Sequence, residues 1–468
     1  MNAPSADQLS LVLANTQTAL NLVWTLIAAF LVMFMQAGFA LLESGLTRAK
    51  NVAHTMGMNF LVYAIGALGY WAVGFALQMG GTPAPASLGA DPRAVSEISV
   101  TALGQTWGVF GSHGFFFDQP TPAIAALFVF QMVFMDTALT VPTGAMAERW
   151  RFAAFCAFSL LMSMFIYPVY ANWVWGGGWL SQLGKNLGLG HGHVDFAGSS
   201  VVHMTGGVTA LIGAKLLGPR HGKYTPGGEP VGIPGHSVVL TVLGAFVLAF
   251  GWFGFNAGST LSAMDTRFAV VALNTLLASA AGAVTATLYV WRRFGQPDVT
   301  WMCNGMLAGM VAITAPCAFV GTHAALLIGA VAGVLVVVAA LFVEGTLKID
   351  DPVGASAVHL ANGTWGIVAL GLFADGSYGD GTNGVAGTVR GALHGDTGQL
   401  WAQLIGIAAN LLYVGGCSAL CLWLVDRVFN NRVSLHAEIR GLDLPEMGIE
   451  GYSPEYRGLS PSRASEGE

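Results

Sequence analysis

Long apolar stretches separated by short polar connections dominate the chain. A helix needs about 20 mainly apolar residues to cross roughly 30 Å of hydrocarbon. Stretches of this kind are found at residues 19–42, 53–79, 122–146, 152–174, 196–218, 237–257, 268–291, 299–318, 324–345, 353–374 and 399–425. They are too long for transmembrane β-strands, so the pattern predicts an all-α integral membrane protein with eleven transmembrane helices.

The composition supports a membrane protein and excludes several other classes. Only 9% of the 468 residues are charged, whereas a soluble domain carries about 25%. So few charges cannot cover the surface of a soluble protein, which excludes a soluble enzyme, a nucleic-acid-binding protein and a disordered chain. The 63 glycines predict closely packed helices. The first residues lack the pattern of a cleaved signal peptide.

The distribution of basic residues predicts the orientation. With the N-terminus outside, the inner connections and the tail hold 15 of the 19 Lys and Arg residues, and the outer connections hold four. Because positive residues accumulate on the cytoplasmic side, this favours an N-out/C-in topology. We therefore expect a transmembrane domain at residues 1–427 and a cytoplasmic tail at 428–468.

Two segments of the sequence match each other. Residues 195–207 read DFAGSSVVHMTGG and residues 351–363 read DPVGASAVHLANG, with six of thirteen positions identical. The first opens the fifth span from the outside and the second opens the tenth from the inside. Copies five spans apart must have opposite orientations, so we predict a 5+5 inverted repeat, about 19–218 and 237–374, followed by helix 11 at about 399–425. Inverted repeats around a central site are typical of transporters.

Each copy carries a histidine eight residues after its aspartate, His203 after Asp195 and His359 after Asp351. Eight residues at about 1.5 Å each put each histidine about 12 Å from its own membrane face. In a core of about 30 Å both then lie near the midplane, about 6 Å apart in height. Ionisable groups at this depth are costly and usually mark a pathway, so we favour a functional role for the pair.

The two aspartates stand where N-caps stand, and aspartate is a preferred cap. Capping is therefore the main role that we expect of Asp195 and Asp351. Asp195 also biases the outer vestibule toward cations.

Aromatic residues gather near the expected outer face. Phe130 and Phe134 are one helical turn apart, as are Phe255 and Ser259. Aromatic faces with one hydroxyl can hold a small cation by cation–π attraction. Trp173 and Trp179, in contrast, are expected to be membrane-interface residues.

In their order and spacing, six segments resemble the ammonium transporter family (Amt/Mep/Rh), and bacterial-type Amt proteins in particular. They are MQAGFALLESGLTRAKN (35–51), FQMVFMDTALTVPTGAMAERW (130–150), ANWVWGGGWL (171–180), DFAGSSVVH (195–203), GWFGFNAGS (251–259) and DDPVGASAVH (350–359). The resemblance implies eleven helices with a pseudo-twofold axis, a homotrimer with one path per subunit, and a multi-pass location in the cell (inner) membrane. It also implies a PII-class signalling protein as a partner on the cytoplasmic face.

The resemblance also implies roles for individual residues. The outer substrate-binding site would consist of Phe130, Phe134, Trp175 and Ser259, supported by Asp195. Phe134 and Phe255 would form the pore gate, and His203 and His359 the twin histidines of a narrow apolar pore.

Two positions depart from the family pattern, and a third is unusual for a membrane span. Glu43 replaces a tyrosine near the inner mouth, and Met447 stands where the family tail commonly has histidine. Asp136 lies in the middle of a span, where we expect an interhelical hydrogen bond with Thr or Asn.

The function expected from these features is ammonium transport. Ammonium would be recruited outside, deprotonated, and conducted as ammonia past the histidines. One alternative is an Rh-like neutral-gas channel, against which the complete aromatic site argues. Another is an ammonium sensor (transceptor). A fused signalling domain would support a sensor, but the tail of about 40 residues is too short to contain one. We expect neither a cofactor nor a metal site. His191 and His193 alone are too few potential ligands to indicate a metal site. Enzyme activity is not expected.

Overall fold

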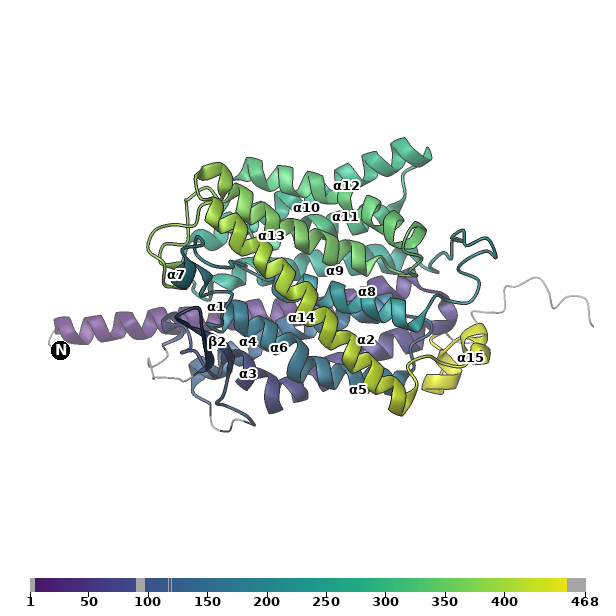
Figure 1. Cartoon of the computed structure of the whole chain (residues 1–468), viewed down its shortest axis with the longest axis horizontal. Coiled ribbons are helices and arrows are strands. Elements are labelled where there is room, and N and C mark those ends of the chain that lie inside the picture. The colour runs from purple at the N-terminus through teal and green to yellow at the C-terminus, as the bar shows by residue number, and fades with distance from the viewer. Residues whose placement is uncertain (1–4, 90–96, 117, 119, 453–468) are drawn as a thin grey trace, which may run out of the picture.

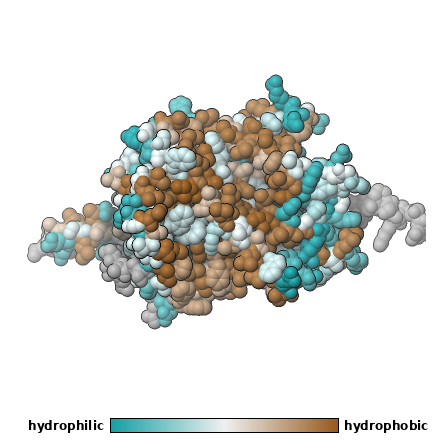
Figure 2. Space-filling view, in the orientation of Figure 1, coloured by the Kyte–Doolittle hydropathy of each residue, from teal (hydrophilic) through white to brown (hydrophobic). Residues whose placement is uncertain are grey.

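Helices that run alongside one another make up most of the molecule (Figure 1). The computed structural model describes residues 5–89, 97–116, 118 and 120–452. Hydrophobic side chains form a broad band across the face shown in Figure 2, and hydrophilic residues gather at the two ends of that band. Within the described residues, ten helices are long and apolar enough to cross a membrane. The chain is therefore a multi-pass membrane protein.

The α-helices vary widely in length, and π-helical turns continue four of the spans. The helices are α1 (Ala6–Leu46), α2 (Val52–Gly69), α3 (Phe75–Met79), α4 (Pro122–Ala145), α5 (Phe152–Leu161), α6 (Tyr167–Trp175), α7 (Leu183–Leu187), α8 (Thr205–Leu217), α9 (Val238–Ala257), α10 (Arg267–Phe294), α11 (Val299–Thr314), α12 (Thr322–Gly345), α13 (Asn362–Phe373), α14 (Thr397–Phe429) and α15 (Leu435–Arg440). The π-helical turns are η2 (Tyr70–Gly74) between α2 and α3, η4 (Met162–Ile166) between α5 and α6, η5 (Ser199–Met204) before α8 and η7 (Ser356–Ala361) before α13.

The helices agree with the expected spans except in length. The span expected at 299–318 corresponds to α11, which has 16 residues. At about 1.5 Å per residue it is about 24 Å long, less than the roughly 30 Å of a bilayer core. The count of eleven crossings and their orientation therefore stay predictions. Helix α1 starts well before residue 19, because Ser5 accepts a hydrogen bond from the Gln8 backbone N–H and forms a capping box with it.

Glycine allows α1 and α9 to cross in close contact. A Cβ on Gly244 would lie 2.4 Å from the Leu42 backbone nitrogen, and one on Gly38 would lie 2.8 Å from Leu248 Cγ. Neither gap admits a side chain, so the two backbones touch along this line. The contact confirms the close packing expected from the glycine content.

The connection between α3 and α4 contains the one departure from an all-α fold among the described residues. Strands β1 (Glu97–Ala102) and β2 (Gln105–Gly111) pair as an antiparallel hairpin. Leu103 and Gly104 link them with φ of 53° and 71°. Positive φ at both central residues is the geometry of a type I′ turn, which suits the twist of a two-stranded hairpin.

Two tryptophans hold this hairpin against the end of α6. Trp173 Nε1 donates a hydrogen bond of 2.8 Å to the Val109 carbonyl, and the Trp179 backbone N–H donates one of 2.9 Å to the Gly108 carbonyl. The sequence predicts both residues to be at the membrane interface. In the structure they attach the connection to the helices, and their place at the interface stays a prediction.

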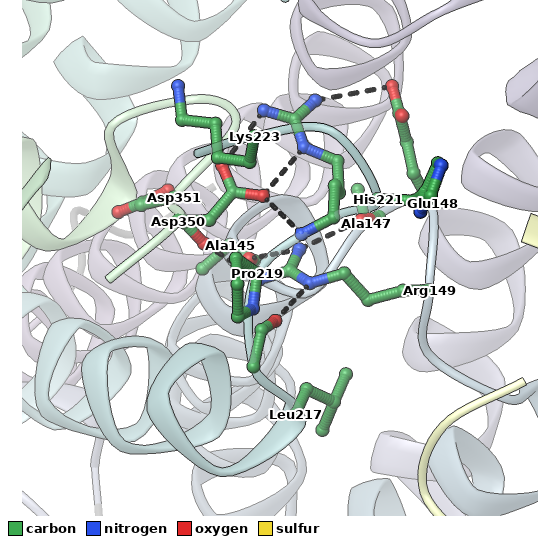
Figure 3. A network of polar contacts seen from close by, with 12 residues as sticks. Ala145, Ala147, Glu148, Arg149, Leu217, Pro219, His221, Lys223, Asp350 and Asp351 are labelled. Atoms are coloured by element: carbon green, nitrogen blue, oxygen red, sulfur yellow. Dashed lines mark hydrogen bonds and ion pairs between the residues drawn. The ribbon is translucent and has the colours of Figure 1, made fainter. Parts of the chain in front are cut away.

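A buried network of charged side chains joins the connections that follow α4, α8 and α12 (Figure 3). Arg220 donates three hydrogen bonds of 2.8–2.9 Å to the Asp350 carboxylate and also pairs with Glu148 at 3.4 Å. Burial by itself raises the pKa of Asp350, but the hydrogen bonds and charge of Arg220 outweigh it and lower the pKa to about 2. The charge of Arg220 is therefore neutralised within the protein by Asp350 and Glu148.

Arg149 is one of the basic residues that the topology predicts in the inner connections, yet it is not exposed. Its side chain is fully buried, and it donates hydrogen bonds to the carbonyls of Ala145, Ala147, Gly218 and Asp350. The five donors of a guanidinium group allow one residue to tie several backbone segments together. Arg149 is thus a structural residue rather than part of a docking surface.

The lowered pKa of Asp350 predicts acid sensitivity. Its folded pKa of about 2 lies below the ordinary value of 3.8, so its stabilising effect is complete above about pH 4 and is lost as the pH falls toward 2. The difference corresponds to about 2 kcal/mol. Thermal unfolding in detergent between pH 5 and pH 2 should show this loss in the wild type. Asp350→Asn should be less stable at neutral pH and lose less on acidification. An equal slope for both proteins would contradict the assignment.

The segment after α14 folds back onto the same end of the molecule. The Val433 N–H donates to the Arg149 carbonyl at 3.1 Å, and the His54 N–H donates to Asp443 Oδ1 at 3.0 Å. A Cβ on Gly57 of α2 would lie 2.6 Å from the Met447 side chain, so Met447 packs onto this glycine. Residues 453–468 of the expected tail lie outside the described residues. The division between domains 1–427 and 428–468 stays a prediction.

Candidate functional site

A cavity of about 180 Å³ lies at the end of the bundle where α4 begins and α6 ends. Phe130 and Phe134 of α4 line it together with Trp175 of α6 and Ser259. The structure thus brings together the four substrate-binding side chains that the sequence predicts. None of the lining residues is charged, so the cavity offers a cation aromatic faces and hydroxyl oxygen rather than a counter-ion.

The orientation of Trp175 depends on Asp195. Trp175 Nε1 donates a hydrogen bond of 2.7 Å to the Asp195 backbone carbonyl. The indole ring meets Phe134 edge-on, with ring centroids 5.9 Å apart and an interplanar angle of 76°. With its N–H already bonded, the indole presents its ring to the cavity. Asp195 contacts the site through this tryptophan.

Ser259 is arranged to accept a hydrogen bond. It lies in the turn η6 (Gly258–Thr260) after α9, and its hydroxyl donates to the Phe255 carbonyl at 2.8 Å. Because the hydroxyl proton is used inside the helix, the oxygen lone pairs remain for a donor in the cavity. Ammonium, which has only donors, matches such a group.

Two stacked phenylalanines close the side of this cavity that faces the histidines. The rings of Phe134 and Phe255 have centroids 4.1 Å apart and an interplanar angle of 22°. On the other side of this pair, the ring of His203 stacks against Phe255 at 5.4 Å. Both phenylalanines are buried. A solute passing from the cavity to the histidine must therefore displace or rotate these rings.

The two predicted histidines lie side by side. His203 Nδ1 and His359 Nδ1 are 3.2 Å apart, and their ring planes stack at 26°. At this distance one imidazole donates to the other, so the pair shares one proton between the two nitrogens. His203 Nε2 has no hydrogen-bond partner among the described residues. Trp252 also stacks on His203, with ring centroids 5.0 Å apart and an interplanar angle of 17°.

The two matching sequence segments build this pair in the same way. Asp195 accepts hydrogen bonds of 2.7–3.0 Å from the backbone N–H groups of residues 198–201. Asp351 accepts bonds of 2.7–3.1 Å from those of residues 354–356. Both aspartates therefore cap the helices that carry the histidines, which confirms the capping role. Each capped segment begins with a π-helical turn, η5 or η7, and the histidine lies within that turn.

A small second cavity follows on the far side of the histidines. It has a volume of about 20 Å³ and is lined by residues that include His359, Phe39 and Glu43. Roughly 10–15 Å³ is enough to hold one water molecule. A larger vestibule of about 410 Å³ shares Asn304 and Val353 with this cavity. Aromatic cavity, phenylalanine pair, histidine pair, small cavity and vestibule thus follow one another through the bundle.

Comparison with known proteins decides the family. The model of the Ammonium Transporter Family matches residues 23–452. The chain belongs to the ammonium transporter family. This agrees with the resemblance carried by the sequence motifs.

Curated relatives and solved structures cover nearly the whole transporter. It is 45% identical to the ammonium transporter Amt2 of Archaeoglobus fulgidus over 94% of this chain and 89% of that protein. It is 38% identical to the ammonium transporter Amt1 of Haloferax mediterranei over 94% of this chain and 80% of that protein. A solved structure described as a sensor Amt protein aligns with a TM-score of 0.80 and 34% identity, covering 92% of this chain and 99% of that one. Mep2 of Candida albicans aligns with a TM-score of 0.75 and 27% identity, covering 90% and 88%.

Some residues of the path in this transporter were not identified from the sequence. Phe196 and Gln131 line the aromatic cavity, and Trp252 flanks the histidine pair. Helical spacing could have indicated two of them, because Trp252 lies three residues before Phe255 and Gln131 lies three residues before Phe134. Asp136 lines none of the three cavities described above; it is buried in α4, and its Oδ1 atom has no hydrogen-bond partner among the described residues. The bond to Thr or Asn expected for it is not present at this atom.

His191 and His193 of the transporter point to different partners. His191 Nε2 lies 2.9 Å from the Gly387 carbonyl, and His193 Nε2 lies 3.0 Å from the Ser200 hydroxyl. Burial lowers the pKa of His193 to about 4, so this imidazole is neutral at physiological pH. Their contacts explain both residues as structural elements beside η5.

Proposed function

We propose that the protein is an ammonium transporter that recruits ammonium at the aromatic cavity and conducts ammonia through the histidine pair. The observation that carries the proposal is the continuous order of cation-attracting aromatic rings, a closed phenylalanine pair and two hydrogen-bonded imidazoles. Family membership supports the substrate. Phe130, Phe134, Trp175 and Ser259 would bind ammonium, with Asp195 as their support, and Phe134 and Phe255 would form the gate.

The proposed mechanism explains how the path would exclude potassium, an ion of about the same size as ammonium. The passage beyond the cavity is lined by phenylalanine and imidazole rings, and transferring an unpaired charge into such surroundings costs many kcal/mol. Ammonium avoids this cost because it can release a proton and continue as ammonia. Potassium has no proton to release, so it stays in the outer cavity.

The histidine pair would serve the proton as well as the ammonia. Ammonia can accept a hydrogen bond from an imidazole N–H, and linked imidazoles can relay a proton by exchanging donor and acceptor roles. If the proton follows the ammonia, each transport cycle carries one positive charge across the membrane.

We also propose the topology and assembly that this mechanism requires. Eleven crossings with an N-out/C-in orientation and a 5+5 inverted repeat would bring Asp195 to the outer side and Asp351 to the inner side. A homotrimer in the cell (inner) membrane would then contain one path per subunit. Residues 1–427 would form the transport domain, and residues 428–468 would lie in the cytoplasm.

The test is transport by the purified protein in proteoliposomes. Addition of ammonium should produce an inward current with a matching change of internal pH, and addition of potassium should produce neither. Uptake without current would favour an Rh-like neutral-gas channel. The absence of any ammonium-dependent uptake would overturn the proposal.

An ammonium sensor is a second candidate, because a sensor Amt protein is among the similar structures at 34% identity. A sensor would bind ammonium in the same aromatic cavity with little or no flux. Calorimetric binding of ammonium to a protein that produces no current would favour the sensor over the transporter.

Trp175 should contribute directly to substrate affinity. Trp175→Leu removes a cation–π face worth about 0.5–2 kcal/mol, so the half-saturation concentration of ammonium should rise about 2- to 30-fold. Trp173→Leu is a matched control, because Trp173 lies on the same helix but bonds to the hairpin. Trp175→Phe should retain part of the affinity. An unchanged half-saturation concentration in Trp175→Leu would remove this residue from the binding site.

A PII-class signalling protein is the proposed partner of the cytoplasmic face. Arg48, Lys50 and Arg151 are partly exposed there, whereas Arg149 is buried. Binding should require these three residues and weaken with salt, because exposed charges are screened within about 10 Å at 0.1 M. Truncation after residue 429 tests whether the tail contributes. Absence of binding to the intact transporter at low salt, in every nucleotide state, would exclude this partner.

A further inference from the structure

Glu43 is a buried acid beside the conduction path that the mechanism above does not use. It lies near the end of α1, and only 2% of its surface is exposed. The ion pairs found among the described residues do not include it. A buried carboxylate without a cation is unfavourable, so the group must hold either a proton or a cation from elsewhere.

Neutral side chains fix the position of this carboxyl group. Asn59 Nδ2 donates to Glu43 Oε2 at 2.7 Å, and the Thr143 hydroxyl lies 2.8 Å from Oε2 and 3.0 Å from Oε1. Gln36 and Thr140 in turn hold Asn59, through bonds of 3.2 Å and 3.1 Å to its Oδ1. These donors orient the carboxyl group without supplying a positive charge.

Glu43 occupies a specific position along the path. It lines the small cavity together with His359 and Phe39. Asn304 and Val353 border both this cavity and the vestibule that also includes Arg220, Lys223 and Asp351. A molecule that leaves the histidine pair therefore meets Glu43 before it reaches the charged vestibule.

We infer that Glu43 is the proton donor and ammonium-binding group at the inner end of the path. This inference rests on the proposed function, because it requires ammonia to arrive from the histidine pair. The ammonia lone pair takes the proton of the carboxyl group, so one N–H bond forms and one O–H bond breaks. The bonding electrons stay on Glu43 as carboxylate, and ammonium is held as its counter-ion. When ammonium moves into the vestibule, the Glu43 carboxylate takes a proton from a cytoplasmic hydronium ion, which becomes water.

A purely structural role makes a different prediction. Asn59 needs an acceptor, which the carbonyl oxygen of glutamine also provides, and the Thr143 hydroxyl can donate to the Thr140 carbonyl at 2.5 Å. Glu43→Gln therefore preserves shape and an acceptor but has no proton to transfer at physiological pH. A structural Glu43 predicts normal transport in this variant, whereas a proton-donating Glu43 predicts a defect.

The experiment measures ammonium uptake and current in proteoliposomes whose internal pH is set between 5.5 and 8.5. Wild-type uptake should depend on internal pH. Glu43→Gln should lower the rate by at least about tenfold and flatten that dependence. Glu43→Asp should recover part of both. Asp136→Asn is the matched control, because it makes the same carboxyl-to-amide change at another buried acid, and it should behave as wild type.

The outcomes separate this inference from the proposed function. If the wild type conducts ammonium and Glu43→Gln has the same rate and pH profile, Glu43 is structural and the inference is wrong. If the wild type conducts no ammonium, both proposals fail. If Glu43→Gln does not fold, Glu43→Asp and infrared difference spectra of the wild type decide. The inference is supported if ammonium removes a protonated carboxyl band from the wild-type spectrum and the frequency of that band differs in Glu43→Asp. If ammonium removes no such band, the inference is overturned.

Discussion

His203→Ala should abolish selective ammonium transport while leaving the protein folded. The variant removes one partner of the 3.2 Å contact with His359 and the ring that stacks against Phe255 and Trp252. Ammonia then loses its hydrogen-bonding partner in the passage, and the proton relay is interrupted. A positioned acid–base group contributes at least about a hundredfold to a rate, and we expect a loss of at least this size in proteoliposome uptake.

Two further variants control for the lost ring. His203→Phe keeps an aromatic ring but has no nitrogen, and it should fail in the same way. His54→Ala removes another fully buried imidazole, in α2, which packs against Phe152. It should transport normally if it folds. Wild-type flux and unchanged exclusion of potassium in His203→Ala would count decisively against the relay.

Asp195→Ala should destabilise the protein and inactivate it. The carboxylate of Asp195 accepts hydrogen bonds from four backbone N–H groups and from the Ser200 hydroxyl. Alanine leaves these buried donors without an acceptor, and each hydrogen bond to a charged group contributes about 1.5–3 kcal/mol. We expect a loss of several kcal/mol in stability, seen as a lower melting temperature in detergent. Transport should be lost as well, because η5 carries His203 and the Asp195 carbonyl orients Trp175.

Graded variants distinguish capping from a direct charge effect on the substrate. Asp351→Ala removes the equivalent cap of η7, which has three backbone donors, and should be less severe. Asp195→Asn keeps one acceptor oxygen and should melt between the wild type and the alanine variant. A melting temperature for Asp195→Ala equal to that of the wild type would contradict the capping account.

The local features of the path followed from spacing along the chain. Phe130 and Phe134 are four residues apart, so they lie on one face of any α-helix that contains them. The position of each histidine relative to its capping aspartate sets its depth in the same way. Apolar stretches similarly identify the membrane helices, because a helix in hydrocarbon satisfies its own backbone groups. Such features depend only on the geometry of one helix and its surroundings.

Contacts between distant segments could not be derived in this way. The sequence marks Glu43 as unusual, but only the packing of α1 against α4 and η7 places it beside His359 in one cavity. Arg149 looks like an exposed positive residue, yet carbonyl groups from segments up to about 200 residues away bury it. The hairpin at residues 97–111 also depends on contacts with Trp173 and Trp179 for its position.

The sequence by itself therefore determined the membrane class and the family, and it predicted which aromatic residues and which histidines lie together. Hydropathy, helical period and cap chemistry act over a few turns, and each can be recognised in a single segment. Only the tertiary structure decided that the imidazoles lie in hydrogen-bond contact, that π-helical turns carry them, and that Glu43 follows them on the path. These arrangements depend on how separate helices approach one another. Close packing of many small residues sets that geometry, and no single sequence segment reveals it.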